Sequence, residues 1–185
     1  MLARSDQRVK IGGVIRRLAA LCAAAACCFA VASCSSSSPD KPSAGASGGA
    51  SVPSYASSND QHGAQQFASY WVDALNKATV SGKTVQIKAL SDKSCTRCSD
   101  FAAQLDKIYA NGGHVETSGW NVETMVPERG LPQGTAAMKV QVKVAPQSVY
   151  ETAKSKPQTV KGGQLTFRLV LGRDGDKWVV KSLDV

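Results

Sequence analysis

Residues 138–144 read Met-Lys-Val-Gln-Val-Lys-Val, a strict alternation of apolar and polar side chains. Because successive side chains of a strand point to opposite faces, this stretch predicts a strand with one buried face and one solvent-exposed face. Residues 165–171 repeat the alternation, and residues 172–176 predict a turn that returns the chain through residues 178–180. The C-terminal part of the chain therefore predicts an antiparallel sheet.

The residues before this sheet follow a helical period. Phe67, Trp71 and Leu75 recur at a spacing of four and predict the buried face of a helix over residues 61–79. Gly82 follows the end of this pattern, as is typical of a residue that terminates a helix. The first structured element is therefore expected to be a long amphipathic helix.

A second long helix is predicted after a short connecting helix or turn over residues 84–90. Asp92 or Ser94 is its expected N-cap, because both side chains can accept a hydrogen bond from a backbone N–H of the first turn. The glycines at residues 112–113 end it. Its buried stripe is predicted to consist of Phe101, Leu105, Ile108 and Tyr109.

From His114 the period changes to two, and a strand region interrupted by Gly119 is predicted to close at Pro127. Between the strands at 138–144 and 165–171, a connecting loop is expected to carry Lys154, Lys156 and Lys161. Helices gathered before a run of strands indicate the α+β class. We therefore predict N-terminal helices packed on the concave face of a curved antiparallel sheet.

The first 33 residues resemble a bacterial lipoprotein signal peptide. Basic residues precede an apolar run from Leu18 to Ala32, and small residues lead directly into Cys34, in the manner of a lipobox. The alternative, an uncut membrane-spanning helix, needs about 20 predominantly apolar residues, and this run is shorter. We expect cleavage before Cys34, acylation of that cysteine, and anchoring on the extracytoplasmic face of the cell membrane.

Residues 34–60 are rich in Ser, Gly, Ala and Pro and are predicted to be a disordered tether, followed by one domain over residues 61–185. Removing residues 1–33 takes away five of the 22 Lys and Arg and one of the 14 Asp and Glu, so the net charge falls from +8 to +4. This modest charge, together with the exported location, argues against a nucleic-acid partner.

Cys95 and Cys98 have three interpretations. An oxidising compartment favours a disulfide, which in the chain-entropy model would stabilise the fold by about 2 kcal/mol for so short a loop. A redox-active pair is the alternative, because Lys93, Arg97 and a helix N-terminus would favour a thiolate, although no β-α-β context surrounds the motif. Half of a zinc site is the third, but it lacks a second Cys pair.

The ordered set of Phe67–Asn76, Leu90-Ser91, Cys95-x-x-Cys98, Ile108-Tyr109 and Gly112-Gly113 resembles an actinobacterial lipoprotein domain family of unknown function. That family is similar to the nuclear-transport-factor-2-like cone, the fold of ketosteroid isomerases and scytalone dehydratase. The resemblance implies a cone-shaped α+β domain. It does not imply an activity, because members of this fold include enzymes, binding modules and assembly subunits.

The sequence indicates no catalytic residues, no metal site and no cofactor. Its carboxylates are expected at caps, turns and polar strand faces, and no combination of nucleophile, base and acid is discernible. Aromatic residues are more informative, because a cone of this type leaves a gap between its helices and its sheet. The candidate pocket residues are Tyr70, Trp71, Phe101, Tyr109, Trp120 and Phe167.

We therefore predict a noncatalytic module that binds a hydrophobic small molecule or another envelope protein, with the membrane reached through Cys34. Two alternatives remain: an isomerase- or dehydratase-like enzyme of the cone fold, and a thiol–disulfide redox protein that uses Cys95 and Cys98. The aromatic residues also have a simpler interpretation, in which they only fill the core.

Overall fold

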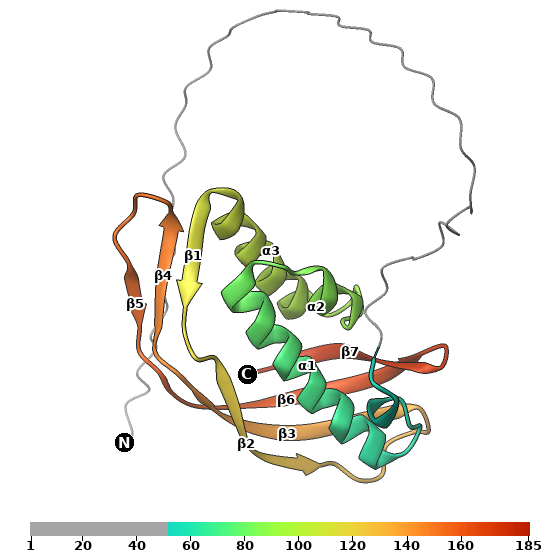
Figure 1. Cartoon of the computed structure of the whole chain (residues 1–185). Helices are drawn as coiled ribbons and strands as arrows, with labels where there is room; N and C mark the ends of the chain where they lie inside the picture. Colours follow the sequence, from blue (N-terminus) through green and yellow to red (C-terminus); the bar gives the residue numbers. More distant parts are fainter. Residues whose placement is uncertain (1–51) are drawn as a thin grey trace, which may run out of the picture. The chain divides into compact units, whose positions relative to one another are not determined.

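The computed structural model describes residues 52–185 (Figure 1). The predicted signal peptide, Cys34 and the predicted tether as far as residue 51 lie outside the described residues. Helical segments come first along the chain and strands follow them. The elements are η1 (Ser54–Ala56), α1 (Gln61–Ser81), α2 (Val85–Ala89), α3 (Thr96–Ala110), β1 (Gly112–Glu116), β2 (Trp120–Pro127), β3 (Thr135–Val144), β4 (Gln147–Thr152), β5 (Gln158–Val160), β6 (Gly163–Asp174) and β7 (Lys177–Asp184).

Helix α1 is capped at both ends, by a side chain at its N-terminus and by a glycine at its C-terminus. The Asp60 carboxylate accepts a hydrogen bond of 2.7 Å from the Gly63 N–H, which is the expected N-cap interaction. At the other end Gly82 has a φ of +69°, and its N–H bonds to the Ala78 carbonyl. Both the predicted helix and its predicted stop are confirmed.

Helix α3 begins later than its predicted N-cap. The cap position is Cys95, and neither Asp92 nor Ser94 caps the helix. The Asp92 carboxylate instead accepts hydrogen bonds from the backbone N–H and the hydroxyl of Ser94 and from Lys181 of β7. The N-cap prediction was therefore wrong, because one Asp92 oxygen is used in a local turn with Ser94 and the other in the ion pair with Lys181.

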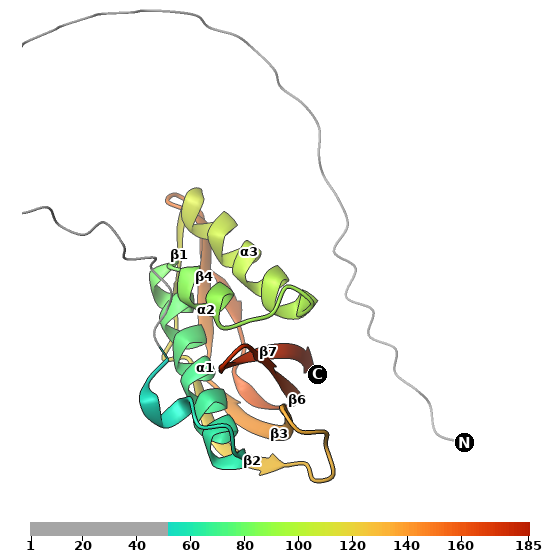
Figure 2. The same cartoon turned by 90° about the vertical axis from the view of Figure 1, so that its right-hand side faces the viewer.

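The strands form two antiparallel sheets. One has the order β2-β3-β6-β7 and the other β1-β4-β5. The pairs Met138–Leu169 and Val140–Phe167 lie opposite each other between β3 and β6, so the predicted apolar faces coincide. Figure 2 shows β7, β6, β3 and β2 following one another downwards, with α2 and α3 above them and α1 running down beside them to the level of β2.

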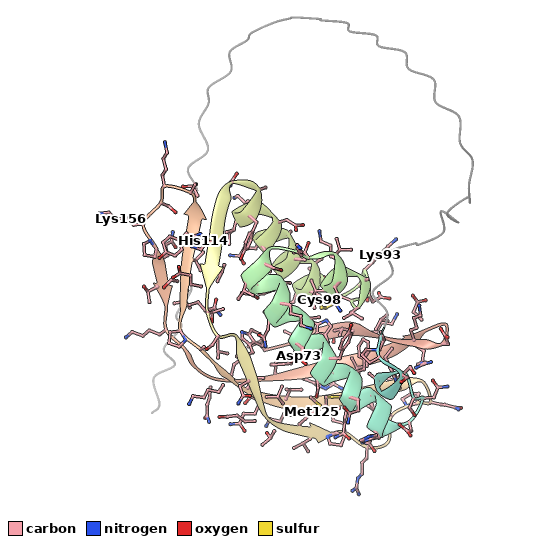
Figure 3. All side chains as sticks on the ribbon, viewed as in Figure 1. Asp73, Lys93, Cys98, His114, Met125 and Lys156 are labelled. Carbon is pink, nitrogen blue, oxygen red and sulfur yellow. A yellow bond between two sulfur atoms is a disulfide. The ribbon has the colours of Figure 1, made fainter. Side chains whose placement is uncertain are left out.

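The segment between β3 and β6 contains a hairpin rather than the predicted loop. β4 pairs with β1 on one side and with β5 on the other, and Val149 lies opposite Gln158. Every residue of β5 is exposed, so no alternation of burial marks it in the sequence. Lys156 projects from the turn between β4 and β5 (Figure 3).

The core lies between the helices and the four-stranded sheet. Phe67 and Trp71 of α1 are buried together with Val140 of β3 and with Phe167 and Leu169 of β6. This arrangement of N-terminal helices on a curved antiparallel sheet confirms the predicted α+β class and agrees with the arrangement expected from the resemblance to the nuclear-transport-factor-2-like cone. The period-two and period-four patterns predicted the core residues correctly because apolar periodicity indicates which face of each element is buried.

The packed domain begins earlier than the predicted boundary at Gln61. Ala56 of η1 is fully buried, and the Trp178 indole N–H donates a hydrogen bond of 2.8 Å to the Ser58 carbonyl. Residues 52–60, which were predicted to belong to the tether, therefore pack on the domain. This stretch carries no periodic apolar pattern, and a backbone carbonyl makes the long-range contact.

Candidate ligand pocket

A cavity of about 160 Å³ lies between the helices and the sheet. Its walls come from five elements and are almost entirely apolar. The residues that line it are Trp71 and Leu75 of α1, Ile87 of α2, Arg97, Cys98 and Phe101 of α3, Trp120 of β2 and Leu183 of β7.

Helical spacing explains how two of these walls are built. Trp71 and Leu75 are four residues apart on α1, and Cys98 and Phe101 are three apart on α3, so each pair lies on one face of its helix. Arg97 precedes Cys98 and brings a charged group to the same wall. The α1 wall and the α3 wall are therefore each the buried stripe of an amphipathic helix.

The Trp71 side chain is held in a fixed orientation. Its indole N–H donates a hydrogen bond of 3.1 Å to the Ser91 hydroxyl, which in turn donates to the Ile87 carbonyl at 2.8 Å. The one polar atom of the indole is thereby satisfied away from the cavity. The ring is free to present an apolar surface to whatever occupies the space.

The position of Trp120 in the cavity wall is fixed by hydrogen bonds to its backbone groups. The Asn76 side-chain amide donates to the Trp120 carbonyl and accepts from the Trp120 N–H, both at 2.8 Å. Gly119 lies beside this contact with a φ of +86°, and a Cβ atom there would come within 2.6 Å of Asn76 Oδ1. Behind the cavity wall the Trp120 ring packs on Phe167 with centroids 5.8 Å apart.

Cys95 and Cys98 form a disulfide, with their Cα atoms 5.3 Å apart. The predicted bond is therefore present, at the start of α3. Cys98 faces the 160 Å³ cavity and also a neighbouring pocket of about 200 Å³. Cys95 and Cys98 are only 1% and 5% exposed, which leaves little access for an attacking thiolate.

Arg97 is the one charged residue that lines the cavity, and the ion pairs of α2, α3 and β7 lie outside its lining. A hydrogen bond from Lys181, assisted by Ser94, holds the pKa of Asp92 well below its ordinary value. Lys88, with help from Thr84, lowers the pKa of Asp106 in the same way. Both carboxylates are thus stabilised in the ionised form by partners outside the cavity.

The lining contains no carboxylate and no imidazole, so it offers no group for proton transfer at neutral pH. Within residues 52–185 no three or more His, Cys, Asp or Glu side chains come together in a way that could hold a metal ion. What the cavity provides is an apolar, rigid enclosure with a cation among its lining residues.

Three of the six predicted pocket residues line the cavity: Trp71, Phe101 and Trp120. Phe167 is buried behind Trp120 as part of the core. The remaining two, Tyr70 and Tyr109, do not line it and have hydrogen-bonding roles instead.

Tyr70 accepts a hydrogen bond from the Gln86 amide at 2.5 Å. The Tyr109 hydroxyl donates to the Thr79 carbonyl at 2.8 Å and accepts from the Val115 N–H at 3.4 Å. Tyr109 therefore ties the end of α1 to β1, and its role is structural.

Five lining residues were not predicted as pocket residues: Leu75, Ile87, Arg97, Leu183 and Cys98, which was predicted only as a disulfide partner. A signal was available for Arg97, because it lies four residues before Phe101 and a helix places such residues on one face. Leu183 had no local signal. It reaches the cavity only because β7 passes beneath α3.

Two larger grooves lie elsewhere. One of about 320 Å³ separates residues 59–61 from the loop between β2 and β3, and its lining is mixed polar and apolar. The other, of about 290 Å³, lies between α3 and the β4–β5 hairpin. Neither is walled mainly by apolar side chains, so the cavity beneath α1 and α3 is the better candidate site.

No helix among the described residues has the length and apolar character needed to cross a membrane. No curated protein matches the chain in sequence. Solved structures do match it in fold.

The intermembrane-space region of the chloroplast protein ARC6 is 11% identical, with a TM-score of 0.51, and the match covers 68% of this chain and 95% of that one. Aln2 from a Streptomyces species is 12% identical with a TM-score of 0.42, over 65% of this chain and 85% of that one. A protein of the nuclear-transport-factor-2-like family from Streptomyces avermitilis is 12% identical with a TM-score of 0.41, over 65% and 93%.

Identities this low show a shared fold and nothing about activity. A family model matches in sequence, over residues 51–184, which is nearly the whole described domain. The chain belongs to that family, a family of unknown function (DUF6318).

Proposed function

We propose that this protein is a lipid-anchored, extracytoplasmic module that binds a small, largely apolar molecule without transforming it. The observation that carries this proposal is the cavity beneath α1 and α3, whose walls are apolar and fixed in place. Trp71 is held by Ser91, and the Trp120 backbone is held by Asn76. A pocket formed in advance costs little ordering when a ligand enters.

The size of the cavity limits the ligand. At about 160 Å³ it is smaller than the roughly 300–1,000 Å³ of pockets that enclose drug-sized molecules. An apolar cavity of about 150 Å³ accommodates a benzene-sized molecule. The proposed ligand therefore inserts one ring or one short branched alkyl group, and any remainder stays outside.

The proposed location rests on the N-terminal pattern that ends at Cys34. The disulfide supports it independently, because such bonds persist in oxidising, exported compartments and are rare in the cytosol. A tether between Cys34 and the packed segment at Val52 would hold the domain close to the lipid surface. The cavity would then meet molecules that leave or enter the membrane.

Two other functions receive less support. A cone-type enzyme needs an acid or base inside the cavity, and none lines it. Each carboxyl group with a shifted pKa among residues 52–185 is shifted downwards, the opposite of a general acid kept protonated near neutral pH. A redox role needs an accessible sulfur atom, and Cys95 and Cys98 are buried.

Native mass spectrometry of the processed protein, extracted from its own membrane, tests the proposal. The wild-type protein is expected to carry a small-molecule adduct. Leu183→Trp places an indole in the cavity and should remove the adduct. Val85→Trp adds the same side chain at a position that is 69% exposed and should retain it. An empty wild-type domain, or an adduct that survives in L183W, contradicts the proposal.

A further inference from the structure

We infer that the ligand of this cavity is a small monocarboxylic acid, with its apolar ring or branched chain inside and its carboxylate on Arg97. The inference rests on the proposed function, because it names the chemical class of the molecule bound there. It comes from the contrast between one charged lining residue and seven lining residues that carry no charge.

Arg97 is the one charged residue among those that line the cavity. Two lysines on nearby elements have counter-ions: Lys88, which lines the neighbouring pocket, pairs with Asp106, and Lys181 of β7 pairs with Asp92 at 2.6 Å. No ion pair joins Arg97 to another residue between Val52 and Val185. Arg97 is an exposed residue and at the same time lines an apolar enclosure.

The chemistry of the guanidinium suits an oxyanion. It is planar and always charged, and its paired N–H donors match the two oxygens of a carboxylate. The rest of the lining, from Trp71 to Leu183, can only accept apolar atoms. A molecule with one apolar group next to one carboxylate therefore satisfies both parts of the site, whereas a neutral apolar molecule leaves Arg97 unused.

Lys93 provides the matched comparison. It also lies close to Cys98, but it lines the neighbouring pocket and not the cavity. It is exposed, and Figure 3 shows it projecting away from the folded domain. Removing its charge changes the net charge by the same amount as removing the Arg97 charge, so it separates a local carboxylate contact from a general electrostatic effect.

The test uses the acylated protein in phosphatidylcholine vesicles, with phenylacetate and 2-phenylethanol as probes. Binding is followed by tryptophan emission, since Trp71 and Trp120 line the cavity. Wild-type protein should bind phenylacetate at least about tenfold more tightly than the neutral alcohol, which corresponds to about 1.4 kcal/mol. Arg97→Gln should abolish that preference by weakening the binding of phenylacetate, and Lys93→Gln should retain the preference.

The two proposals fail in different ways. Equal affinity of the wild-type protein for both probes, or a preference that survives in R97Q, overturns the carboxylate inference and leaves the apolar pocket intact. If neither probe binds the wild-type protein, or if both probes bind L183W as tightly as they bind the wild type, the cavity is not the site. The proposed function then fails together with the inference.

Discussion

Asn76 of α1 and Trp120 of β2 are joined by two hydrogen bonds of 2.8 Å, through which one side-chain amide satisfies both the N–H and the carbonyl of the Trp120 backbone. The two residues are 44 positions apart in the chain. This contact fixes the start of β2 against α1 and with it the aromatic wall of the cavity.

Asn76→Ala should lower the free energy of unfolding by about 1–3 kcal/mol, because two partly buried backbone groups lose their partners. It should also weaken binding of any ligand in the cavity, since Trp120 is no longer held. Chemical denaturation and tryptophan emission measure the two effects. Asn121→Ala, at an exposed position of β2, is the control and should be close to neutral. Equal stability of N76A and N121A would contradict the role of this contact.

Gly82 is required for two reasons that can be separated. It has a φ of +69°, and a Cβ atom there would overlap the ring of Tyr109. Gly82→Ala should therefore destabilise the domain by about 2–5 kcal/mol, from left-handed backbone strain and overpacking together. Gly175→Ala shares the positive φ, at +60°, but meets nothing within 4 Å, so it should cost only about 1–2 kcal/mol. Thermal unfolding of both variants decides whether the Tyr109 contact matters.

The disulfide should stabilise the fold without being needed for it. Replacing both Cys95 and Cys98 by Ala is expected to cost about 2 kcal/mol, the chain-entropy value for a short loop. Dithiothreitol should destabilise the wild-type protein by a similar amount and leave the double variant unchanged. Urea unfolding with and without reductant measures this. A double variant that still responds to reductant would show that the effect does not come from this bond.

Asp92 predicts a loss of stability in acid. Its pKa is lowered in the folded protein, first by Lys181 and then by Ser94, so its contribution is fully present above the unfolded value of about 3.9. The contribution disappears as the pH falls through the lower folded pKa. The difference in urea midpoint between wild type and Asp92→Asn should therefore be largest above about pH 4 and shrink on further acidification.

Asp100→Asn is the comparison for this effect. Asp100 is exposed on α3 and takes part in no ion pair among the described residues. The D100N midpoint should follow that of the wild type at every pH. A difference for D92N that stays constant from neutral pH to about pH 2 would show that the Lys181 pair is not the cause.

Membrane attachment should depend on Cys34. Cys34→Ala is expected to prevent acylation, measured as loss of incorporated labelled palmitate. The acylated wild-type protein should sediment with membranes and enter the detergent phase. Ser35→Ala is the control, since it changes the next residue and leaves the acceptor cysteine in place. Palmitate incorporation that is equal in C34A and wild type would exclude lipidation at this position.

Sequence patterns alone established most of the fold, because periodicity reports locally which face of an element is buried. The alternation at 138–144 predicted β3, and the spacing from Phe67 to Leu75 predicted the buried face of α1. The Cys95–Cys98 pairing also followed from sequence, through compartment and spacing. The β4–β5 hairpin did not, because β5 has no buried face and is held by backbone pairing.

The sequence was not sufficient to predict which residues line the cavity. Its aromatic composition pointed correctly to Trp71, Phe101 and Trp120, yet Tyr109 is equally aromatic and uses its hydroxyl to join α1 and β1. Sequence composition states which side chains are apolar. It does not state which of them meet and which leave space between them.

The tertiary structure decides which side chains meet and which leave space between them. Arg97 and Leu183 line one cavity although they lie on α3 and on the last strand, and nothing local to either residue requires it. Burial of one face is a property that each element encodes in its own residues, whereas a gap in packing depends on how several distant elements fit together. The sequence by itself thus determined a helix-and-sheet domain with a disulfide, and the packing of its elements determined where a cavity forms.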